Sequence, residues 1–448
     1  MAAFPSHDEL VRELAELIAI PSVSADATHV ADLARAAEWV AERIRAAGGE
    51  AAVETVNGRA FLTGEIRASG GGDAPTVLGY AHLDVQPPDP LELWTSDPWT
   101  LVERDGLLFA RGVADDKGHA YLLVKAAATL AAAGELPVNV RFAFDAEEEV
   151  GGHTVVDWVT ADARGADVAL VLDGGYVTEE LPSFCTALRG LCYFHLKVRT
   201  GERDLHSGIF GGGALNALHA LVQILGAVLA GPDGRVPEPL REGIVPPTDA
   251  ELAGWSSLRT GAEELAGAGA RPMDATAERD FWLRTTSEPT VEVNGIEGGS
   301  ARLQKTVLPV EALANISVRL APGQRASVIG PVMARLLREA CPPGAELELE
   351  QWASSEPGWV DSAAPAIQLT RAAFADALGA EPVLARTGGA IPVVASLCAK
   401  GIPVVVSGFT RPSARMHSPD ENIPAAALDD GLRATVEALR RLGSLERR

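Results

Sequence analysis

The spacing of apolar residues changes in a regular way along the first part of the chain. In some segments apolar residues recur at helical intervals, and in others β-branched and aromatic residues follow one another. Helices are predicted at residues 9–20, 31–47, 117–133 and 154–160, and strands at residues 76–85, 138–144 and 168–173. This alternation is typical of an α/β fold with a mostly parallel sheet covered by helices.

A different order of elements begins at about residue 190. The predicted elements are a strand at 191–199, a helix at 214–230, strands at 290–294 and 314–320, a helix at 327–340 and a strand at 345–351. This βαββαβ order is ferredoxin-like, and a Pro- and Gly-rich insertion without a readable signature interrupts it at about 231–280. From residue 366 the α/β pattern returns, with helices predicted at residues 366–378 and 427–442. We therefore predict one domain from residues 1–189 and 366–448, with residues 190–365 inserted as a second domain.

The charge balance narrows the classes of partner. The 448 residues include 38 Lys and Arg against 61 Asp and Glu, so the net charge is 38 − 61 = −23. Such an acidic chain is not expected to bind nucleic acid or an anionic membrane surface. We also expect no signal peptide and no membrane span, because no run of some eighteen apolar residues occurs. Four cysteines without a CxxC pair fit a reducing compartment, and we predict a cytoplasmic protein.

Polar clusters follow several of the predicted strands. They contain His82 and Asp84, Asp115 and Asp116, Glu148 and Glu149, and Asp173, with His417 in a later loop. The carboxyl ends of strands in α/β sheets are where ligands bind, and adjacent carboxylates repel one another unless a cation compensates. Imidazole with carboxylate favours zinc, cobalt or manganese, and the ligands outnumber those that one tetrahedral ion needs. The sequence therefore predicts two divalent metal ions.

His82 and Asp84 are expected to point to the same face of their strand. Asp84 can then accept the second N–H of the imidazole and fix its tautomer.

At these motifs the chain resembles the M20 family of metallopeptidases, and within it the branch of carnosinase-like cytosolic dipeptidases. The segments that carry the resemblance include GYAHLDVQPP, FARGVADDKG, DAEEEVGG, LRGLCYF, DLHSGIFGG, RTGGAIPVV and MHSPDEN. They occur in the order of the family and cover nearly the whole chain. The resemblance implies a catalytic domain with an inserted lid and dimerisation domain, and a homodimer.

The resemblance also implies a role for each matching residue of the metal site. His82 and Asp173 are implied as ligands of one ion, Glu149 and His417 as ligands of the other, and Asp115 as the bridge, with a cis peptide bond to Asp116. Glu148 is implied as the general base for a hydroxide that bridges the two ions. Glu147 is expected to face solvent or a basic neighbour.

Other matches concern the substrate. His206 is implied as the donor to the oxyanion, and His206 and Thr306 are both expected to reach the site of the partner subunit. Arg319 matches the residue that binds the C-terminal carboxylate of the substrate, for which a guanidinium is well suited. Gly388 and Gly389 match the turn whose N–H groups approach the same carboxylate.

Two departures leave the substrate open. Thr387 stands where the dipeptidase branch commonly has a Glu that contacts the free amino group, and Ser354 and Ser355 lie where a His often occurs. The first hypothesis is a hydrolase of dipeptides or short peptides. The alternative is an amidohydrolase of N-acyl amino acids. A third hypothesis, a module that binds metal or peptide without catalysis, would require the loss of a ligand or of Glu148, and none is missing.

Overall fold

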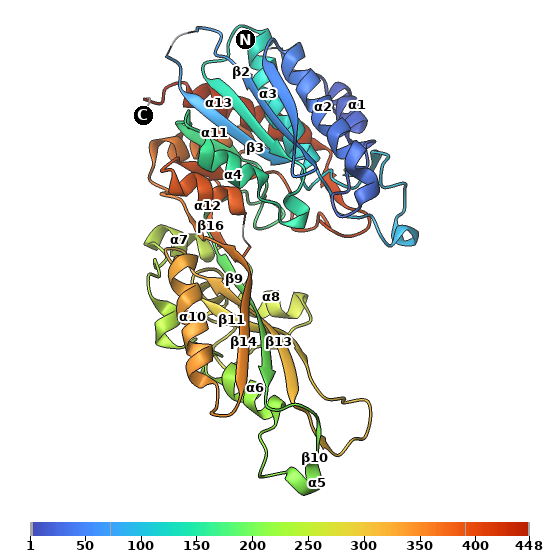
Figure 1. Cartoon of the computed structure of the whole chain (residues 1–448). Coiled ribbons are helices and arrows are strands. Elements are labelled where there is room, and N and C mark those ends of the chain that lie inside the picture. Colours follow the sequence, from blue (N-terminus) through green and yellow to red (C-terminus); the bar gives the residue numbers. More distant parts are fainter. Residues whose placement is uncertain (1–2, 72, 390, 447–448) are drawn as a thin grey trace. The chain divides into compact units, whose positions relative to one another are not determined.

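The computed structural model describes residues 3–71, 73–389 and 391–446 (Figure 1). Its residues group into two units. Unit 1 consists of Met1–Thr186, Val360–Ala385 and Ser396–Arg448, and unit 2 consists of Ala187–Trp359 and Arg386–Ala395. Among the helices of the described residues, none is both long enough and apolar enough to cross a membrane.

The large sheet has nine strands, and its centre is parallel. Its order is β1 (Glu50–Val56), β2 (Arg59–Ile66), β6 (Asn139–Asp145), β3 (Thr76–His82), β7 (Val168–Val171), β17 (Val404–Val406), β8 (Ser183–Leu188) and β15 (Gly358–Trp359), with β16 (Val383–Thr387) paired to β8. The strands from β6 to β17 pair in parallel, whereas β1, β2 and β15 pair antiparallel with their neighbours. The predicted α/β class is confirmed.

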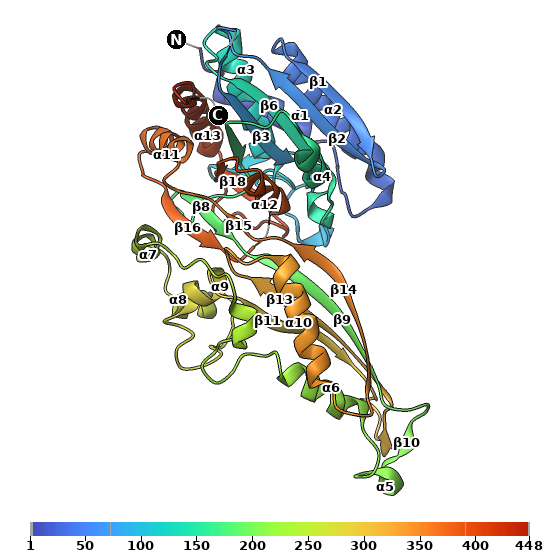
Figure 2. The same cartoon turned by 60° about the vertical axis from the view of Figure 1, so that its left-hand side comes forward.

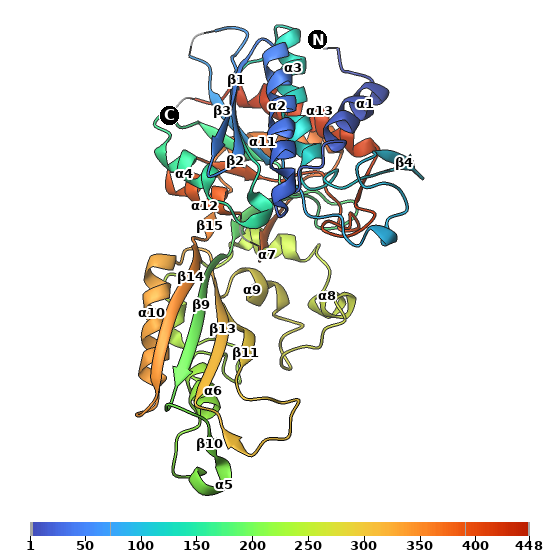
Figure 3. The same cartoon turned by 45° about the vertical axis from the view of Figure 1, so that its right-hand side comes forward.

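The helices of unit 1 lie close to their predicted positions. They are α1 (His7–Ile18), α2 (Val30–Ala46), α3 (Lys117–Ala132), α4 (Thr154–Ala161), α11 (Pro365–Leu378) and α13 (Ala426–Leu442), while α12 (Pro392–Ala399) spans the boundary between the units. Figure 3 shows α2 and α3 on one side of the sheet and α4 on the other. Most residues of α3 are buried, because α3 lies between the sheet and α13.

A small antiparallel sheet fixes two loops that matter for the site. It consists of β4 (Val102–Arg104), β5 (Leu107–Phe109) and β18 (Asn422–Pro424), in the order β18-β5-β4. Because β18 pairs with β5, the segment just before β18 lies beside the segment just after β5. These segments contain His417 and Asp115. Short 3-10 turns lie at Ala27–His29, Leu91–Leu93, Glu148–Val150 and Glu238–Arg241.

Unit 2 contains a four-stranded antiparallel sheet. The elements are β9 (Gly190–Arg199), α6 (Ala217–Gly226), β11 (Thr290–Glu297), β13 (Glu311–Leu320), α10 (Ala326–Ala340) and β14 (Glu346–Ser355), with the strand order β11-β13-β9-β14. This is the predicted βαββαβ arrangement. Figure 2 shows α6 and α10 on the same face of the sheet, and their apolar residues form its core. Helix α6 is shorter than predicted, because Asn216 caps its start and it ends at Gly226.

The insertion in unit 2 is partly helical. It includes α7 (Asp249–Trp255) and α8 (Gly261–Gly267), and α9 (Phe281–Thr286) follows it. A two-stranded sheet of β10 (Leu205–His206) and β12 (Val307–Leu308) lies near the short helix α5 (Ser207–Phe210). None of these elements is predicted from the sequence.

Candidate metal centre

The register of the sheet gathers the predicted ligands of unit 1. His82 ends β3 and lies opposite Asp145, the last residue of β6, so Glu148 and Glu149 follow close to the end of β3. Asp173 comes two residues after the end of β7, the other neighbour of β3. The pairing of β18 with β5 adds the loops that carry Asp115 and His417.

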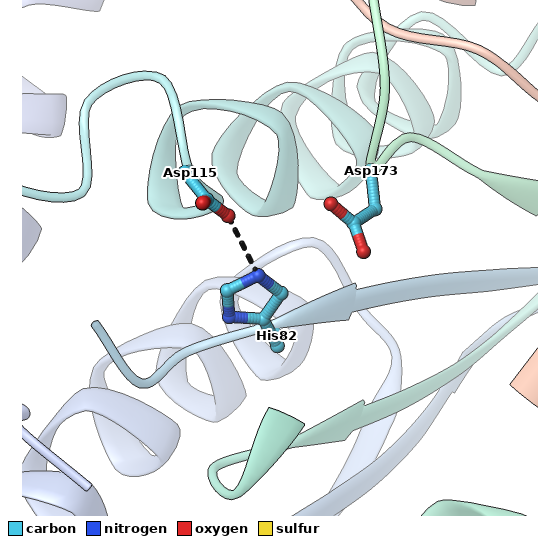
Figure 4. A group of neighbouring side chains, drawn as sticks. All are labelled: His82, Asp115 and Asp173. Atoms are coloured by element: carbon cyan, nitrogen blue, oxygen red, sulfur yellow. Dashed lines mark hydrogen bonds and ion pairs between the residues drawn. The ribbon is translucent and has the colours of Figure 1, made fainter. Parts of the chain in front are cut away.

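One group of candidate ligands consists of His82, Asp115 and Asp173 (Figure 4). Each offers one ligand atom, and these atoms all lie within 4.8 Å of one another. Nε2 of His82 is 2.9 Å from Oδ1 of Asp115, and Figure 4 shows the two side chains pointing toward one another, with Asp173 beside them. The peptide bond between Asp115 and Asp116 is cis, as predicted.

A second group consists of Asp115, Glu149 and His417. Nε2 of His417 is 2.9 Å from Oδ2 of Asp115 and 3.2 Å from Oε2 of Glu149. Asp115 therefore presents one carboxylate oxygen to each group. The structure brings together the five residues that the family resemblance singles out as ligands, in the same two sets.

Asp84 holds the backbone beside the site. Its carboxylate accepts the N–H of Glu148 at 3.2 Å and that of Glu149 at 3.1 Å. Nδ1 of His82 is closer to the backbone oxygen of Asp84, at 3.0 Å, than to its carboxylate, at 3.5 Å. Thus the main acceptor for the imidazole is the carbonyl group, and the carboxylate orients the turn that carries Glu148 and Glu149.

The electrostatics of the site suit a cation. Burial raises the pKa of Asp173 to about 7, with a further contribution from Asp116. Burial likewise raises the pKa of Glu148 to about 7. Hydrogen bonds to Asp115 and Glu149 raise the pKa of His417 to about 10. With its pKa near 7, Asp173 carries a proton for part of the time at neutral pH, and a divalent ion bound there would displace that proton.

Glu147 meets the second of the two alternatives that are expected for it, a basic neighbour. The side chain is only 8% exposed and does not face solvent. Its Oε1 accepts the N–H of Thr154 at 2.7 Å, in the first turn of α4, because the N-cap residue His153 makes no side-chain cap. Its Oε2 lies 3.9 Å from Nε of Arg59. Arg59 is therefore the basic neighbour of Glu147.

Two residues of the site were missed from sequence. The buried Glu421 accepts the N–H groups of Gly112, Ala114 and Asp115 at 2.8–3.1 Å. It also accepts a 2.7 Å hydrogen bond from the guanidinium of Arg111, so it fixes the loop that carries Asp115. Nε2 of Gln86 donates to Oε2 of Glu149 at 2.7 Å. Gln86 lies in the GYAHLDVQPP motif and Glu421 in the MHSPDEN motif. Their closeness in sequence to candidate ligands is the only hint of their role that the sequence gives.

The remaining predicted residues belong to unit 2. His206 lies in β10 opposite Val307, and the N–H of Ser207 donates to the carbonyl oxygen of Thr306 at 2.9 Å. Both His206 and Thr306 are exposed. Nδ1 of His206 accepts the N–H of Gly208 at 3.0 Å, so the proton of a neutral ring is on Nε2.

Arg319 and the glycine turn occupy another part of unit 2. Arg319 lies in β13 between Thr290 of β11 and Leu191 of β9. A Cβ atom at Gly388 would be 2.7 Å from the carbonyl oxygen of Thr285 and 3.2 Å from the guanidinium of Arg189. Burial, with repulsion from Arg319, lowers the pKa of Arg189 to about 10. Arg189 thus lies near both Arg319 and the glycine turn. The sequence analysis did not single it out, although it belongs to the LRGLCYF motif.

Several known proteins match this chain over nearly its whole length. A cysteinylglycine-S-conjugate dipeptidase of Corynebacterium striatum is 29% identical over 97% of this chain and 96% of its own. A beta-Ala-His dipeptidase of Rattus norvegicus is 28% identical over 97% of this chain and 89% of its own. The structure of the M20 family metallo-carboxypeptidase Sso-CP2 from Sulfolobus solfataricus has the same fold, with a TM-score of 0.83, 24% identity and coverage of 98% of this chain and 100% of its own.

The family named from the motifs is confirmed, and with it the class of enzyme, a hydrolase that acts on peptide or amide bonds. Residues 78–441 match the sequence model of "Peptidase family M20/M25/M40", and the chain belongs to this family.

Proposed function

We propose that this protein is a dipeptidase that depends on two divalent metal ions. The observation that carries the proposal is the position of Asp115, which offers Oδ1 to His82 and Oδ2 to His417. Two three-residue groups that share one carboxylate are suited to a pair of neighbouring ions. The names of the two full-length relatives supply the substrate class.

The donor atoms fit borderline divalent cations. Each group combines one imidazole with two carboxylates, a set that suits zinc and that manganese and cobalt also accept. His82 and Asp173 would hold one ion, Glu149 and His417 the other, and Asp115 both. When bound, the ions supply Lewis-acid activation of the scissile carbonyl group and of water.

Glu148 is the proposed general base. Its backbone N–H is held by Asp84, which orients the side chain at the edge of the site. Its pKa of about 7, raised by burial, suits a carboxylate that accepts a proton from the attacking water near neutral pH. The same carboxyl group can then deliver the proton to the departing amine.

We also propose a homodimer in which His206 and Thr306 serve the site of the partner subunit. The proton on Nε2 of His206 is directed away from the Gly208 N–H, so the exposed ring edge can donate to an oxyanion. Cys192 and Cys341 form no disulfide, which agrees with the cytoplasmic location that forms part of the proposal.

The carboxylate of the substrate is assigned to unit 2. Arg319 supplies a guanidinium fork, and the Gly388-Gly389 turn lets a carboxylate approach its backbone closely, because glycine has no side chain. Arg189 adds a second positive charge beside Gly388. This part of the site would hold the C-terminal end of a dipeptide.

One observation favours the second candidate, an amidohydrolase of N-acyl amino acids. At position 387 there is no carboxylate to pair with a free amino group, and the Thr387 hydroxyl instead accepts the N–H of Gly389 at 3.3 Å. A substrate without a free amine would not need that charge.

The deciding experiment compares the same dipeptides with free and with acetylated amino termini, together with the metal content per chain. We expect hydrolysis of the free set and about two ions per chain. A preference for the acetylated set would assign the protein to the acyl-amino-acid hydrolases. Hydrolysis of neither set by the fully loaded protein would overturn the proposal.

A further inference from the structure

Arg386 lies directly before the Thr387-Gly388-Gly389 turn and is 3% exposed. Its guanidinium forms a bidentate pair with Glu251 of α7, with Nε 2.8 Å from Oε1 and Nη2 3.0 Å from Oε2. It also donates to the carbonyl oxygens of Val245 and Pro246, both at 2.9 Å, and Nη1 lies 3.4 Å from the hydroxyl of Ser287. Because an arginine has five N–H donors and five contacts are present, Arg386 has no donor left for a ligand.

Glu251 has a second task in the same place. Its Oε2 accepts the N–H and the hydroxyl group of Thr248, at 2.7 and 2.9 Å, in the capping box that starts α7. Glu263 makes a capping box of the same geometry with Thr260 at the start of α8. The two boxes differ in their surroundings, since Glu251 is 2% exposed and joined to Arg386, whereas the contacts of Glu263 are at the surface.

The turn is held against the same segment at a second point. Gly388 packs so close to the carbonyl oxygen of Thr285 that a Cβ atom would be 2.7 Å from it. Thr285 lies in α9, and Ser287, which contacts Arg386, follows that helix. The backbone of the turn is therefore fixed on either side of Thr387.

We propose that Glu251 and Arg386 are positioning residues that hold the Gly388-Gly389 turn in the conformation that receives the carboxylate of the substrate. The insertion then takes part in substrate recognition, because it contributes the contacts of Arg386 with Val245, Pro246 and Glu251. This inference rests on the proposed function, in which the turn binds the C-terminal carboxylate.

The test uses a dipeptide that the protein cleaves and the C-terminal amide of the same dipeptide, with wild type, Glu251→Gln and the matched control Glu263→Gln. For Glu251→Gln we expect kcat/KM for the free acid to fall about tenfold or more, mainly through KM, because a displaced turn no longer fits the carboxylate. For the amide, kcat/KM of Glu251→Gln should stay within about twofold of the wild-type value. Glu263→Gln should leave both values near those of wild type.

The ratio of the two substrates in one preparation does not depend on the fraction of folded protein. If Glu251→Gln does not fold, Arg386→Lys, which keeps the charge and loses the fork, provides the same comparison. A parallel loss on acid and amide, or a ratio equal to that of Glu263→Gln, would overturn the inference. If wild type does not prefer the acid over the amide, the carboxylate-binding turn itself is wrong, and with it that part of the proposed function.

Discussion

At the scale of residues, three consecutive glutamates show how surroundings assign different tasks to the same side chain. Glu147 is buried against the first turn of α4 and accepts a hydrogen bond from the N–H of Thr154. Glu148 is half-buried at the edge of the two groups of candidate ligands and has a pKa of about 7. Glu149 contacts His417 and Gln86. The differences arise because the backbone turns sharply after β6, so that neighbouring side chains point in different directions.

The first prediction concerns Glu148. Glu148→Ala should leave the metal content per chain unchanged, because Glu148 belongs to neither ligand group, and should lower kcat by about 10²-fold or more. Metal analysis and steady-state kinetics on the same preparation measure both effects. Turnover near that of wild type would rule out Glu148 as the base.

The glycine turn gives a paired prediction. Gly388→Ala places a Cβ atom 2.7 Å from the backbone oxygen of Thr285, and we expect this overpacking to destabilise unit 2 by about 1–3 kcal/mol. Gly389→Ala should cost little, because its Cβ atom would approach only the Thr387 hydroxyl, at 3.7 Å. Thermal unfolding of both variants provides the check, and equal losses would contradict this account of the turn.

Residue types and spacing were enough to find the groups at strand ends but not the residues that hold them. His82, Asp115 and Asp173 were found because each lies near the start or end of a strongly patterned element. Glu421 and Gln86 act through contacts with distant backbone and side chains, and no local pattern shows which segments meet.

At the scale of elements, apolar periodicity placed the helices of unit 1 to within two residues. It failed in the insertion, where α7 and α8 are too short to show a clear period. Their capping boxes were readable in the segments that begin at Thr248 and Thr260, since each has Glu three residues later. The capping-box pattern therefore predicts the starts of α7 and α8, which the apolar periodicity does not show.

An element-scale prediction concerns the link between α4 and β6. Asp162, the C-cap residue of α4, accepts 2.8 and 2.9 Å hydrogen bonds from Arg141 of β6. Burial opposes ionisation of Asp162, but Arg141 outweighs it and holds the pKa below the usual 3.8. A carboxylate with a lowered pKa stabilises the folded state above its unfolded pKa, and that contribution is lost as the pH falls through the folded pKa.

Asp162→Asn should therefore lower the Tm at pH 7, with a loss of about 3 kcal/mol because Arg141 would keep a buried charge without its partner. The difference in Tm from wild type should remain constant down to about pH 5 and narrow below about pH 4. Thermal scans at these pH values test this, with the exposed Glu54→Gln as control. A difference that widens with acid would show that the pair is not the cause.

At the scale of the whole molecule, the candidate metal ligands and the proposed substrate-binding residues belong to different units. The candidate metal groups come from unit 1, whereas His206, Thr306 and Arg319 come from unit 2. The sequence predicted both sets but not the contact between Arg386 and Glu251, which lie 135 positions apart. A contact between residues so far apart depends on the tertiary fold, which the spacing of residues along the chain does not show.

Mixing inactive variants tests the proposed dimer. If His206 acts on the partner subunit, Glu148→Ala and His206→Ala should complement each other, because each mixed dimer contains one complete site. With random exchange of subunits at equal amounts, about a quarter of the wild-type activity should return. No recovery from dimers shown to have exchanged would place His206 in the site of its own chain.

The division of unit 1 around unit 2 also sets an order during synthesis. Strands β1, β2, β3, β6 and β7 leave the ribosome before unit 2, whereas β17 and α13 follow it. While unit 2 is translated, the first segment of unit 1 therefore lacks two later partners: the edge of β7 is not yet paired with β17, and α3 is not yet covered by α13. His417 is the last of the candidate ligands along the chain, so the group that it forms with Asp115 and Glu149 can assemble only after unit 2 has been translated.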